Sequence, residues 1–308
     1  MKKEHLLFLL AIAFYLSGFY TLIRRIDPFQ YFFYITSWWS YIIFIDTVLF
    51  LKYKRFFVLN RSLFFAVVIS SGYWCFFELM NLWLNNWSYV RLPREPVYRY
   101  LGYFLAFGTV VPAICLTEQS LGGAFRKVCV KPTHIPHYAL YALTIGTAAL
   151  ILTVALPRYC FCLAWVFAIF LLDGLNYRWG FDSFGRDLEH GRMEKLLSWA
   201  IAGLICGFLW EFWNFWSLSK WVYTVPFFTK GKIFEMPLAG YLGFIAFGLE
   251  TAAFTNLVKG IEVPGKRRWY HLVLAASLLC SIVSFPLIDS YSVRSFGSAT
   301  AAARSCNR

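Results

Sequence analysis

Apolar residues dominate the chain in nine runs, each long enough to cross a lipid bilayer as a helix. The runs are continuous and do not alternate between apolar and polar residues, which excludes a membrane β-barrel. Since helices satisfy their own backbone in lipid and about 20 apolar residues span the hydrocarbon core, the pattern predicts an all-α integral membrane protein with about nine transmembrane helices. They are expected at 5–23, 31–51, 62–84, 99–119, 138–156, 159–175, 195–217, 236–257 and 269–288.

Composition and charge agree with a membrane location. Hydrophobic residues make up 59% of the 308 residues and charged residues only 15%, against about 25% charged residues in soluble domains. The net charge of +13 lies mostly in short loops, where it favours contacts with lipid headgroups. No basic cluster interleaved with aromatic residues is long enough for a nucleic-acid interface. Membrane lipids are therefore the expected partners, and nucleic acid is not.

The loop charges also predict an orientation. With the N-terminus in the cytoplasm, 17 of the 29 lysine and arginine residues fall on the cytoplasmic side and 12 on the other, in the sense of the positive-inside rule. The first apolar run has no small-residue cleavage site before Arg24, so it reads as a retained span. The mixed-charge segment 176–195 is expected to be a cytoplasmic surface loop, and the small, polar tail 295–308 is expected to be disordered.

Several kinds of chemistry are disfavoured by what the sequence lacks. The eight cysteines form no CxxC pair and fall mostly within apolar runs, and the five histidines are scattered, so no metal site is expected. Phosphate-cradling glycine loops, paired-aspartate prenyltransferase motifs and nucleophile elbows are absent. ATP-driven transport and prenyl transfer by this chain are therefore disfavoured, and no cofactor is indicated.

Two stretches of the chain resemble each other. "FFELMNLWLNNWSYV" (76–90) aligns with "LWEFWNFWSLSKWVYT" (209–224), and "EPVYRYLGYFLAFG" (95–108) aligns without a gap with "EMPLAGYLGFIAFG" (235–248). The alignment pairs the same polar and aromatic residues in the same order. The pairs are Glu78 with Glu211, Asn81 with Asn214, Trp83 with Trp216, Trp87 with Trp221, Tyr89 with Tyr223, and Glu95 with Glu235.

The resemblance predicts an internal duplication. Upstream, "FID" (44–46) and "LLD" (171–173) place Asp46 opposite Asp173. Each copy holds four spans, and an even number gives both copies the same orientation, related by a pseudo-two-fold axis along the membrane normal. The predicted organisation is a first four-helix repeat at 1–120, a linker at 121–134, a second repeat at 135–257, and an additional helix and tail at 258–308.

Glu78, Asn81, Glu211 and Asn214 are the candidate catalytic residues. Glutamate and asparagine three positions apart share one helix face. A charged group inside the bilayer costs from about 3 to well over 10 kcal/mol, so such residues usually face the bundle interior or a wet cavity. A pseudo-two-fold axis would bring the two pairs towards one central site. Hydrogen bonds that only join helices are an equally open interpretation.

The other matched residues are candidate binding residues with structural alternatives. Two tryptophans and two tyrosines either bind a ligand or form the interfacial aromatic belt. Glu95 and Glu235 either mark a segment that folds over the Glu–Asn site or favour the start of a helix. Glu250, within the eighth span, has no match in the first repeat and could act in the second half alone. These residues are Trp87, Tyr89, Trp221, Tyr223, Glu95, Glu235 and Glu250. Asp46 and Asp173 are expected to pair with Lys52 or Lys54 and with Arg178.

"FEMPLAGYLGF" (234–244), with the upstream "WEFWN" and the W-V-Y that follows, resembles a group of bacterial multi-pass membrane proteins that carries no established activity. This similarity implies a bacterial inner-membrane location. The order Asp46, Glu78 and Asp173, Glu211 is also similar to that in membrane-type lycopene cyclases and carotenoid hydratases, which are duplicated helical membrane proteins. Neither stretch has the paired acid of those cyclases.

Three functions are compatible with the sequence. One is an intramembrane enzyme that uses buried glutamic acid as acid or base on a lipophilic, isoprenoid-like substrate. A second is a transporter or small-molecule binding protein with its site at the repeat interface. A third is a structural or assembly subunit of the membrane. An enzyme is expected to have an asymmetric site, whereas a transporter is expected to keep its two halves equivalent.

Overall fold

The computed structural model describes residues 3–227, 231–263 and 265–297. Among these residues, eight helical segments are long and apolar enough to cross a membrane, and a ninth span arises if one helix pair bent by 43° is counted as a single span. The chain is therefore a polytopic, all-α membrane protein, which confirms the fold class predicted from the hydrophobic pattern.

Four of the spans are built from more than one helical element. The helices that form the spans are α1 (Lys3–Ile23), α2 (Phe33–Tyr53), α3 (Leu63–Leu84), α4 (Pro96–Phe107) with α5 (Val110–Leu121), α6 (Tyr138–Ala155), α7 (Pro157–Cys160) and η2 (Phe161–Trp165) with α8 (Phe167–Trp179), α10 (Glu194–Trp216), η3 (Leu238–Gly240) with α11 (Tyr241–Ile261), and α12 (Arg267–Leu287) with η4 (Ile288–Ser292). The connecting elements are η1 (Phe29–Tyr31), β1 (Trp87–Val90), α9 (Phe184–Glu189), β2 (Lys220–Tyr223), β3 (Lys232–Ile233) and β4 (Met236–Pro237).

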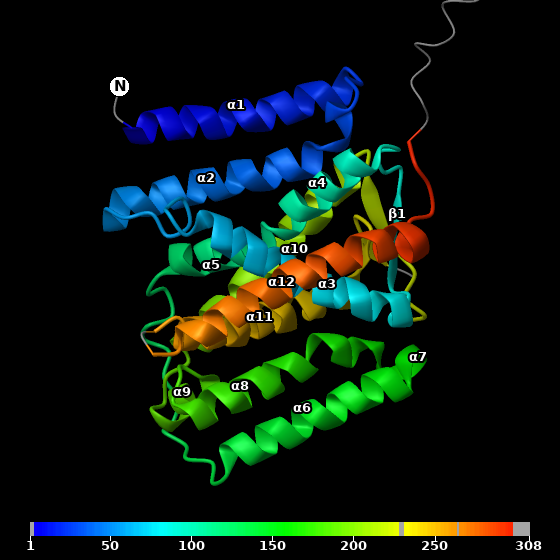
Figure 1. The fold of residues 1–308 in the computed structure, drawn as a ribbon. Helices are drawn as coiled ribbons and strands as arrows, with labels where there is room; N and C mark the ends of the chain where they lie inside the picture. The colour runs from blue at the N-terminus through cyan, green and yellow to red at the C-terminus, as the bar shows by residue number, and fades with distance from the viewer. Residues whose placement is uncertain (1–2, 228–230, 264, 298–308) are drawn as a thin grey trace, which may run out of the picture.

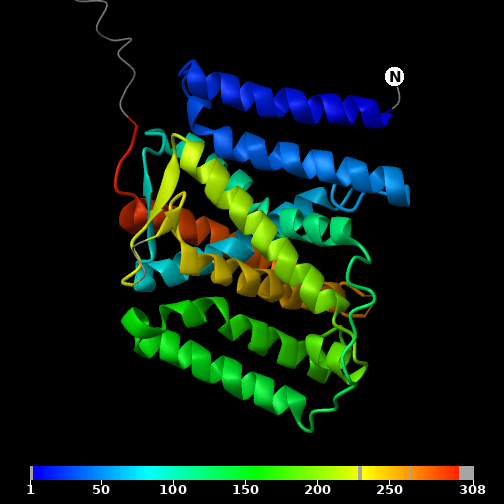
Figure 2. The same ribbon diagram turned by 180° about the vertical axis from the view of Figure 1, so that it is seen from behind.

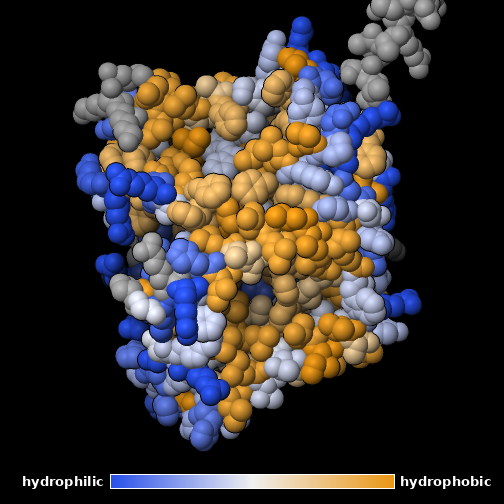
Figure 3. Space-filling view, in the orientation of Figure 1, coloured by the Kyte–Doolittle hydropathy of each residue, from blue (hydrophilic) through white to orange (hydrophobic). Residues whose placement is uncertain are grey.

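The helices lie side by side with two outer pairs around a central group (Figures 1 and 2). Helix α1 packs along α2 at one edge, and α6 packs along α8 at the other. In the centre α10 packs on α11, and α12 packs on α3. A broad hydrophobic band crosses the middle of the surface and is flanked by hydrophilic residues at both helix ends (Figure 3). This is the surface expected of a protein immersed in a bilayer.

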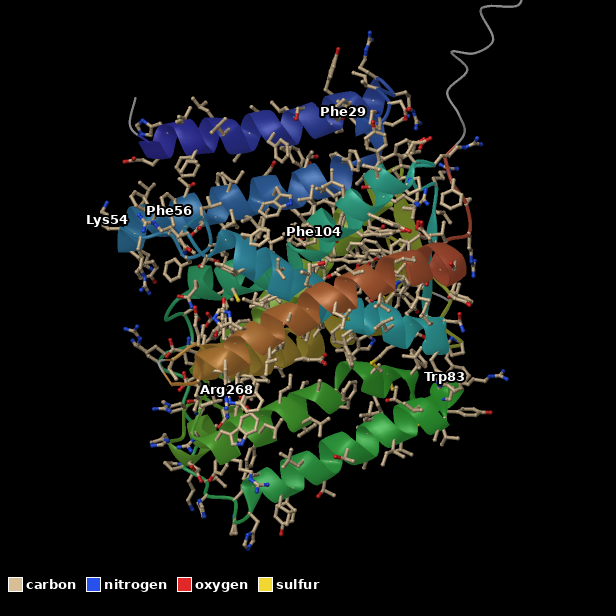
Figure 4. All side chains as sticks on the ribbon, in the orientation of Figure 1. Phe29, Lys54, Phe56, Trp83, Phe104 and Arg268 are labelled. Atoms are coloured by element: carbon tan, nitrogen blue, oxygen red, sulfur yellow. The ribbon has the colours of Figure 1, made fainter. Side chains whose placement is uncertain are left out.

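The two ends of the helices differ in structure. One end, here called the loop end, carries Lys54, Phe56 and Arg268, whereas Trp83 lies at the opposite end (Figure 4). At that opposite end the strands β1 and β2 form a two-stranded antiparallel ribbon. We call it the ribbon end. Helix α3 stops just before the ribbon because Asn85 adopts a left-handed conformation, with φ of 52°, which asparagine tolerates better than most residues.

The ribbon joins the two segments that align in the sequence, and its register is symmetric. Trp87 lies opposite Tyr223, Ser88 opposite Val222, and Tyr89 opposite Trp221. In the sequence alignment Trp87 matches Trp221 and Tyr89 matches Tyr223. Each tryptophan of one strand therefore pairs with the tyrosine of the other strand. The register is therefore symmetric about the Ser88–Val222 pair.

Two segments differ from the sequence-based expectation. The mixed-charge segment 176–195 contains the end of α8, the short helix α9 and the start of α10, so it is not a simple surface loop. Residues 295–297, expected to be disordered, run beside the ribbon, where Leu92 N–H donates to the Ser295 carbonyl and Gly297 N–H donates to the Leu92 carbonyl. The rest of that tail, 298–308, lies outside the described residues.

Candidate functional site

Asn81 and Asn214 attach the ribbon to the helices beneath it. The Asn81 amide donates to the Trp87 carbonyl at 2.9 Å and accepts from the backbone N–H groups of Asn86 and Trp87. Asn214 makes the corresponding pair of bonds to the carbonyl and N–H of Trp221, both at 3.0 Å. Both asparagines are buried, and their contacts fix where each strand begins.

Glu78 lies directly under the ribbon and is held by three aromatic side chains. Its carboxyl accepts hydrogen bonds from the Tyr89 hydroxyl at 2.5 Å, the Trp74 indole N–H at 2.8 Å and the Trp87 indole N–H at 3.2 Å. The glutamate is 0% exposed. Asn81, one turn after Glu78, fixes the start of β1. Two of the three donors to the carboxyl, Trp87 and Tyr89, belong to this strand.

Glu211 occupies the corresponding place in the second half with fewer partners. The Tyr223 hydroxyl donates to its Oε1 at 2.7 Å. Its Oε2 is buried and makes no hydrogen bond of normal geometry within the described structure, although the Trp221 side chain and the Met236 backbone lie near the carboxyl. The two carboxyl groups are thus placed alike and satisfied differently.

The difference begins with one residue on the central helices. Trp74 stands four positions before Glu78, and the residue four positions before Glu211 is Gly207. A side chain at Gly207 would overlap the Phe244 ring, so the second half has an aromatic from α11 where the first half has an indole from α3. Phe244 has no donor to offer the carboxyl. The site is therefore asymmetric.

Tyr89 and Tyr223 keep their hydroxyl protons. Burial is the main cause that raises the pKa of each phenol well above its ordinary value, and the adjacent carboxyl, Glu78 for Tyr89 and Glu211 for Tyr223, raises it further. Each tyrosine is therefore a hydrogen-bond donor to its glutamate at neutral pH.

A cavity of about 510 Å³ lies between the ribbon and the central helices. Aromatic side chains from both halves surround it, and ring contacts across the halves include Trp74 with Trp210 at 6.0 Å and Tyr34 with Trp221 at 5.3 Å between centroids. Apolar side chains form most of its wall. The aromatic lining residues are Tyr31, Phe32, Tyr34, Trp74, Trp87, Tyr89, Tyr98, Tyr103, Phe107, Phe161, Trp165, Trp210, Trp221, Tyr223, Phe227, Phe244 and Phe247.

The two glutamates stand behind this wall and do not line the cavity themselves. Their hydrogen-bond donors Trp74, Trp87, Tyr89 and Tyr223 do line it. The belt interpretation is wrong for Trp87 and Tyr89, which are only 6% and 8% exposed, because the ribbon turns them inward. Trp83 and Trp216, which are 62% and 57% exposed, have the exposure expected of interfacial belt residues.

Charged groups near the ribbon end of the cavity are paired. Arg99 lines the cavity and forms a bidentate ion pair with Asp289, which also accepts from the Tyr103 hydroxyl. Lys220 lines it too and pairs with Glu235 at 2.6 Å. Sequence reasoning missed the pairing of Arg99 with Asp289 because no pattern in the sequence links α4 to η4.

Glu95 and Glu250 lie away from this arrangement. Glu95 is exposed at the start of α4, where its side chain makes no capping hydrogen bond. The strand β1 that precedes it does lie over the Glu–Asn pair. Glu250 is 0% exposed in α11, and neither carboxyl oxygen has a hydrogen-bond partner within the described residues. It does not line the cavity and does not converge on either matched glutamate.

Asp46 and Asp173 serve the loop end and form no ion pair within the described chain. Asp46 accepts from the backbone N–H groups of Phe57, Val58 and Leu59. Asp173 accepts from the backbone N–H groups of Phe184 and Gly185 and from the Tyr138 hydroxyl. The expected pairing with lysine or arginine is wrong, because unpaired loop N–H groups lie within reach of each carboxylate.

No cluster of histidine, cysteine, aspartate or glutamate suited to a metal ion occurs within the described residues. Comparison of the chain with protein-family models, curated proteins and solved structures finds no match.

Proposed function

We propose that this membrane protein binds a lipophilic molecule in the aromatic cavity beneath the ribbon. The single observation that carries the proposal is a cavity of about 510 Å³, walled by rings from both halves and located within the apolar part of the molecule. Its size falls in the range of about 300–1,000 Å³ typical of small-molecule sites. Helices that only hold each other together have no need of such a space.

A catalytic role on an isoprenoid-like substrate is the second candidate. It is favoured by the two Tyr–Glu pairs, since Tyr89 and Tyr223 line the cavity and hydrogen-bond to Glu78 and Glu211. In this version the tyrosine hydroxyls would meet the substrate and the glutamates would act through them as proton acceptors. The order of acids that resembles membrane-type lycopene cyclases agrees with such chemistry.

A transporter is less well supported. Transport through the repeat interface would keep the two halves equivalent, whereas Trp74 in the first half has Gly207 as its counterpart. The asymmetry favours a site that holds one molecule in one orientation.

We also propose that the two halves, 1–120 and 135–257, are copies of one ancestral unit. Matched residues make matched contacts in both: each asparagine binds the strand, each tyrosine binds its glutamate, and each aspartate binds loop N–H groups. The symmetric ribbon register supports the same proposal.

The proposed orientation places the loop end in the cytoplasm of a bacterium, with the chain in the inner membrane. It is supported by the excess of lysine and arginine in the loops at that end, among them Lys54 and Arg268 (Figure 4), following the positive-inside rule. The ribbon then lies on the opposite side of the membrane.

The binding proposal is tested by filling the cavity. Ala106 and Ala246 are matched residues that line it, and Ala106→Trp and Ala246→Trp would occupy much of its volume. The full chain is purified in mild detergent, and bound lipophilic molecules are extracted and quantified by mass spectrometry. We expect each substitution to lower the bound amount about tenfold, a loss of about 1.4 kcal/mol.

Ala148→Trp is the matched control, because Ala148 is exposed on the outer helix α6. It should retain the bound molecules at the level of the unaltered chain. Equal amounts bound to all four proteins would contradict the proposal. Thermal unfolding of each variant checks that the fold survives.

A further inference from the structure

The groups around the cavity carry more negative than positive charge. The two basic side chains in its wall, Arg99 and Lys220, are each paired with an acid, Asp289 and Glu235. Glu78 and Glu211 take part in none of the ion pairs between described residues. When all these groups are ionised, the site has an excess of two negative charges and no protein counter-ion for them.

The Glu78 carboxyl is the acceptor in each of its hydrogen bonds within the described residues. Indole N–H groups can only donate, and both Trp74 and Trp87 point theirs at this carboxyl. The Tyr89 hydroxyl adds a third donor at 2.5 Å, within the range of a charge-assisted O–H···O⁻ bond. Three donors favour the charged form of the carboxyl, against the burial that opposes it. An ionised group buried this deeply favours a positive charge nearby, because the surrounding dielectric is low.

The cavity wall between the carboxylates and the empty space suits an organic cation. The face of an aromatic ring is electron-rich and attracts a cation within about 6 Å of its centroid, and tryptophan does so best. Rings that donate a hydrogen bond to an anion become more electron-rich still, since hydrogen bonds polarise their neighbours. The donors Trp74, Trp87 and Tyr89 are such rings, and all three line the cavity.

A bare metal cation fits this wall poorly. Hard cations need several oxygen ligands, whereas apolar side chains form most of the wall and neither Glu78 nor Glu211 lines it. A cation that carries its own apolar groups needs no such ligands. The apolar groups of such a cation would pack against the rings. Its positive charge would be stabilised by the two carboxylates.

We propose that the cavity binds a lipophilic organic cation, with an ammonium group carrying apolar substituents as the simplest form. This proposal rests on the proposed function and names the chemical class of its ligand. Glu78 and Glu211 supply the charge from behind the wall, and the tryptophans and tyrosines make the contact.

The test compares two probes of the same shape. Octyltrimethylammonium carries a positive charge, and its carbon isostere 2,2-dimethyldecane does not. Binding of each to the full chain in maltoside micelles is measured by the change in tryptophan fluorescence. We expect the cation to bind about tenfold more tightly than the isostere, because neutral rings and uncompensated carboxylates both prefer it.

Substitution of the carboxyl groups then removes the preference. The double variant Glu78→Gln, Glu211→Gln keeps an oxygen to accept from the tyrosines and indoles but loses both charges. Its affinity for the cation should fall about tenfold and approach that for the isostere, whose own affinity should not change. Glu250→Gln is the matched control, a third buried carboxyl in the same half as Glu211 that does not line the cavity, and it should leave the preference intact.

Each outcome has one meaning. Equal binding of both probes to the unaltered chain overturns the cation proposal and leaves the lipophilic cavity standing. A preference for the cation that survives in the double variant also overturns it, since the charge would then come from elsewhere. If neither probe binds, and Ala106→Trp leaves the extracted lipophilic molecules unchanged, the proposed function fails as well.

Discussion

Polar residues buried in these apolar spans act mainly on the backbone of neighbouring segments. Asn81 and Asn214 accept hydrogen bonds from backbone N–H groups at the ribbon. Asp46 and Asp173 accept hydrogen bonds from backbone N–H groups of loops at the other end. A buried N–H or carbonyl group without a partner costs about 1–3 kcal/mol. This cost explains why amide and carboxyl side chains occur where the sequence is otherwise apolar.

Removal of the first asparagine should weaken the fold more than removal of the second. Asn81 makes two hydrogen bonds to β1 and one to the preceding Asn86, and Asn214 makes two to β2. We expect Asn81→Ala to lower the free energy of unfolding by about 1–3 kcal/mol, and Asn214→Ala to lower it by less. Thermal unfolding of both variants in the same detergent measures the difference. Equal losses, or a larger loss for Asn214→Ala, would contradict this assignment.

The sequence allowed the candidate residues to be predicted but not their partners. Glu78, Asn81, Trp87 and Tyr89 could be singled out because the same letters recur later in the chain. That Tyr89 reaches back to Glu78 depends on a strand of four residues, which is too short and too mixed to have a readable period. The loop N–H groups that replaced lysine as partners of Asp46 leave no trace in sequence either.

At the scale of elements, the two central helices α10 and α11 are joined by glycines. A side chain at Gly203 would overlap the Phe244 carbonyl oxygen, and one at Gly248 would overlap the Trp199 carbonyl oxygen. The backbones therefore approach each other directly, in the manner of small-residue helix contacts in membranes. This contact positions Phe244 and Phe247 in the cavity wall.

Gly203→Ala should separate these helices. The added methyl group meets backbone, which cannot move aside as a side chain can, and overpacking of this kind costs about 1–3 kcal/mol. The measurement is again thermal unfolding. Gly102→Ala serves as the control, since its new methyl group would lie 3.5 Å from the Phe32 ring, an ordinary contact, and should not destabilise the protein. A Gly203→Ala variant as stable as Gly102→Ala would show that the helices can part at no cost.

Helices were predictable from the sequence, and their interruptions were not. The spans around 99–119 and 159–175 read as single apolar runs, yet the first is divided into α4 and α5 and the second is bent by 43° before α8. Hydropathy shows only that a run of residues is apolar enough for lipid, and it does not show where the helix within that run breaks or bends. The break between α4 and α5 is supported by Ser70 of α3, which donates to the Phe107 carbonyl and accepts from Val111 N–H, a contact that only the folded state reveals.

At the scale of the whole molecule, the charged loops and the ribbon lie at opposite ends of an apolar band (Figures 1 and 3). The proposed orientation puts the loop end in the cytoplasm. Two positions report on it directly. Cys129 is exposed in the loop that precedes α6, and Ser295 is exposed after the last span, beside the ribbon.

Cysteine labelling should distinguish the two ends. In variants that retain only Cys129, or only a cysteine from Ser295→Cys, a membrane-impermeant maleimide is added to intact cells. We expect the cysteine at position 295 to react at once, and Cys129 to react only after the membrane is permeabilised. The opposite pattern would reverse the proposed orientation.

The symmetric register of the ribbon raises the question of how an asymmetric site can form within it. A strand that pairs with its own counterpart about an axis could pair equally well with an identical copy, so two separate four-helix chains could close the same ladder as a homodimer. Such a dimer would have to give both carboxyl groups the same donors. A covalent link between the halves removes that requirement, and Trp74 in one half can then have Gly207 as its counterpart in the other. Joining the two proposed copies in one chain would therefore allow a symmetric frame to hold the proposed ligand in a single orientation.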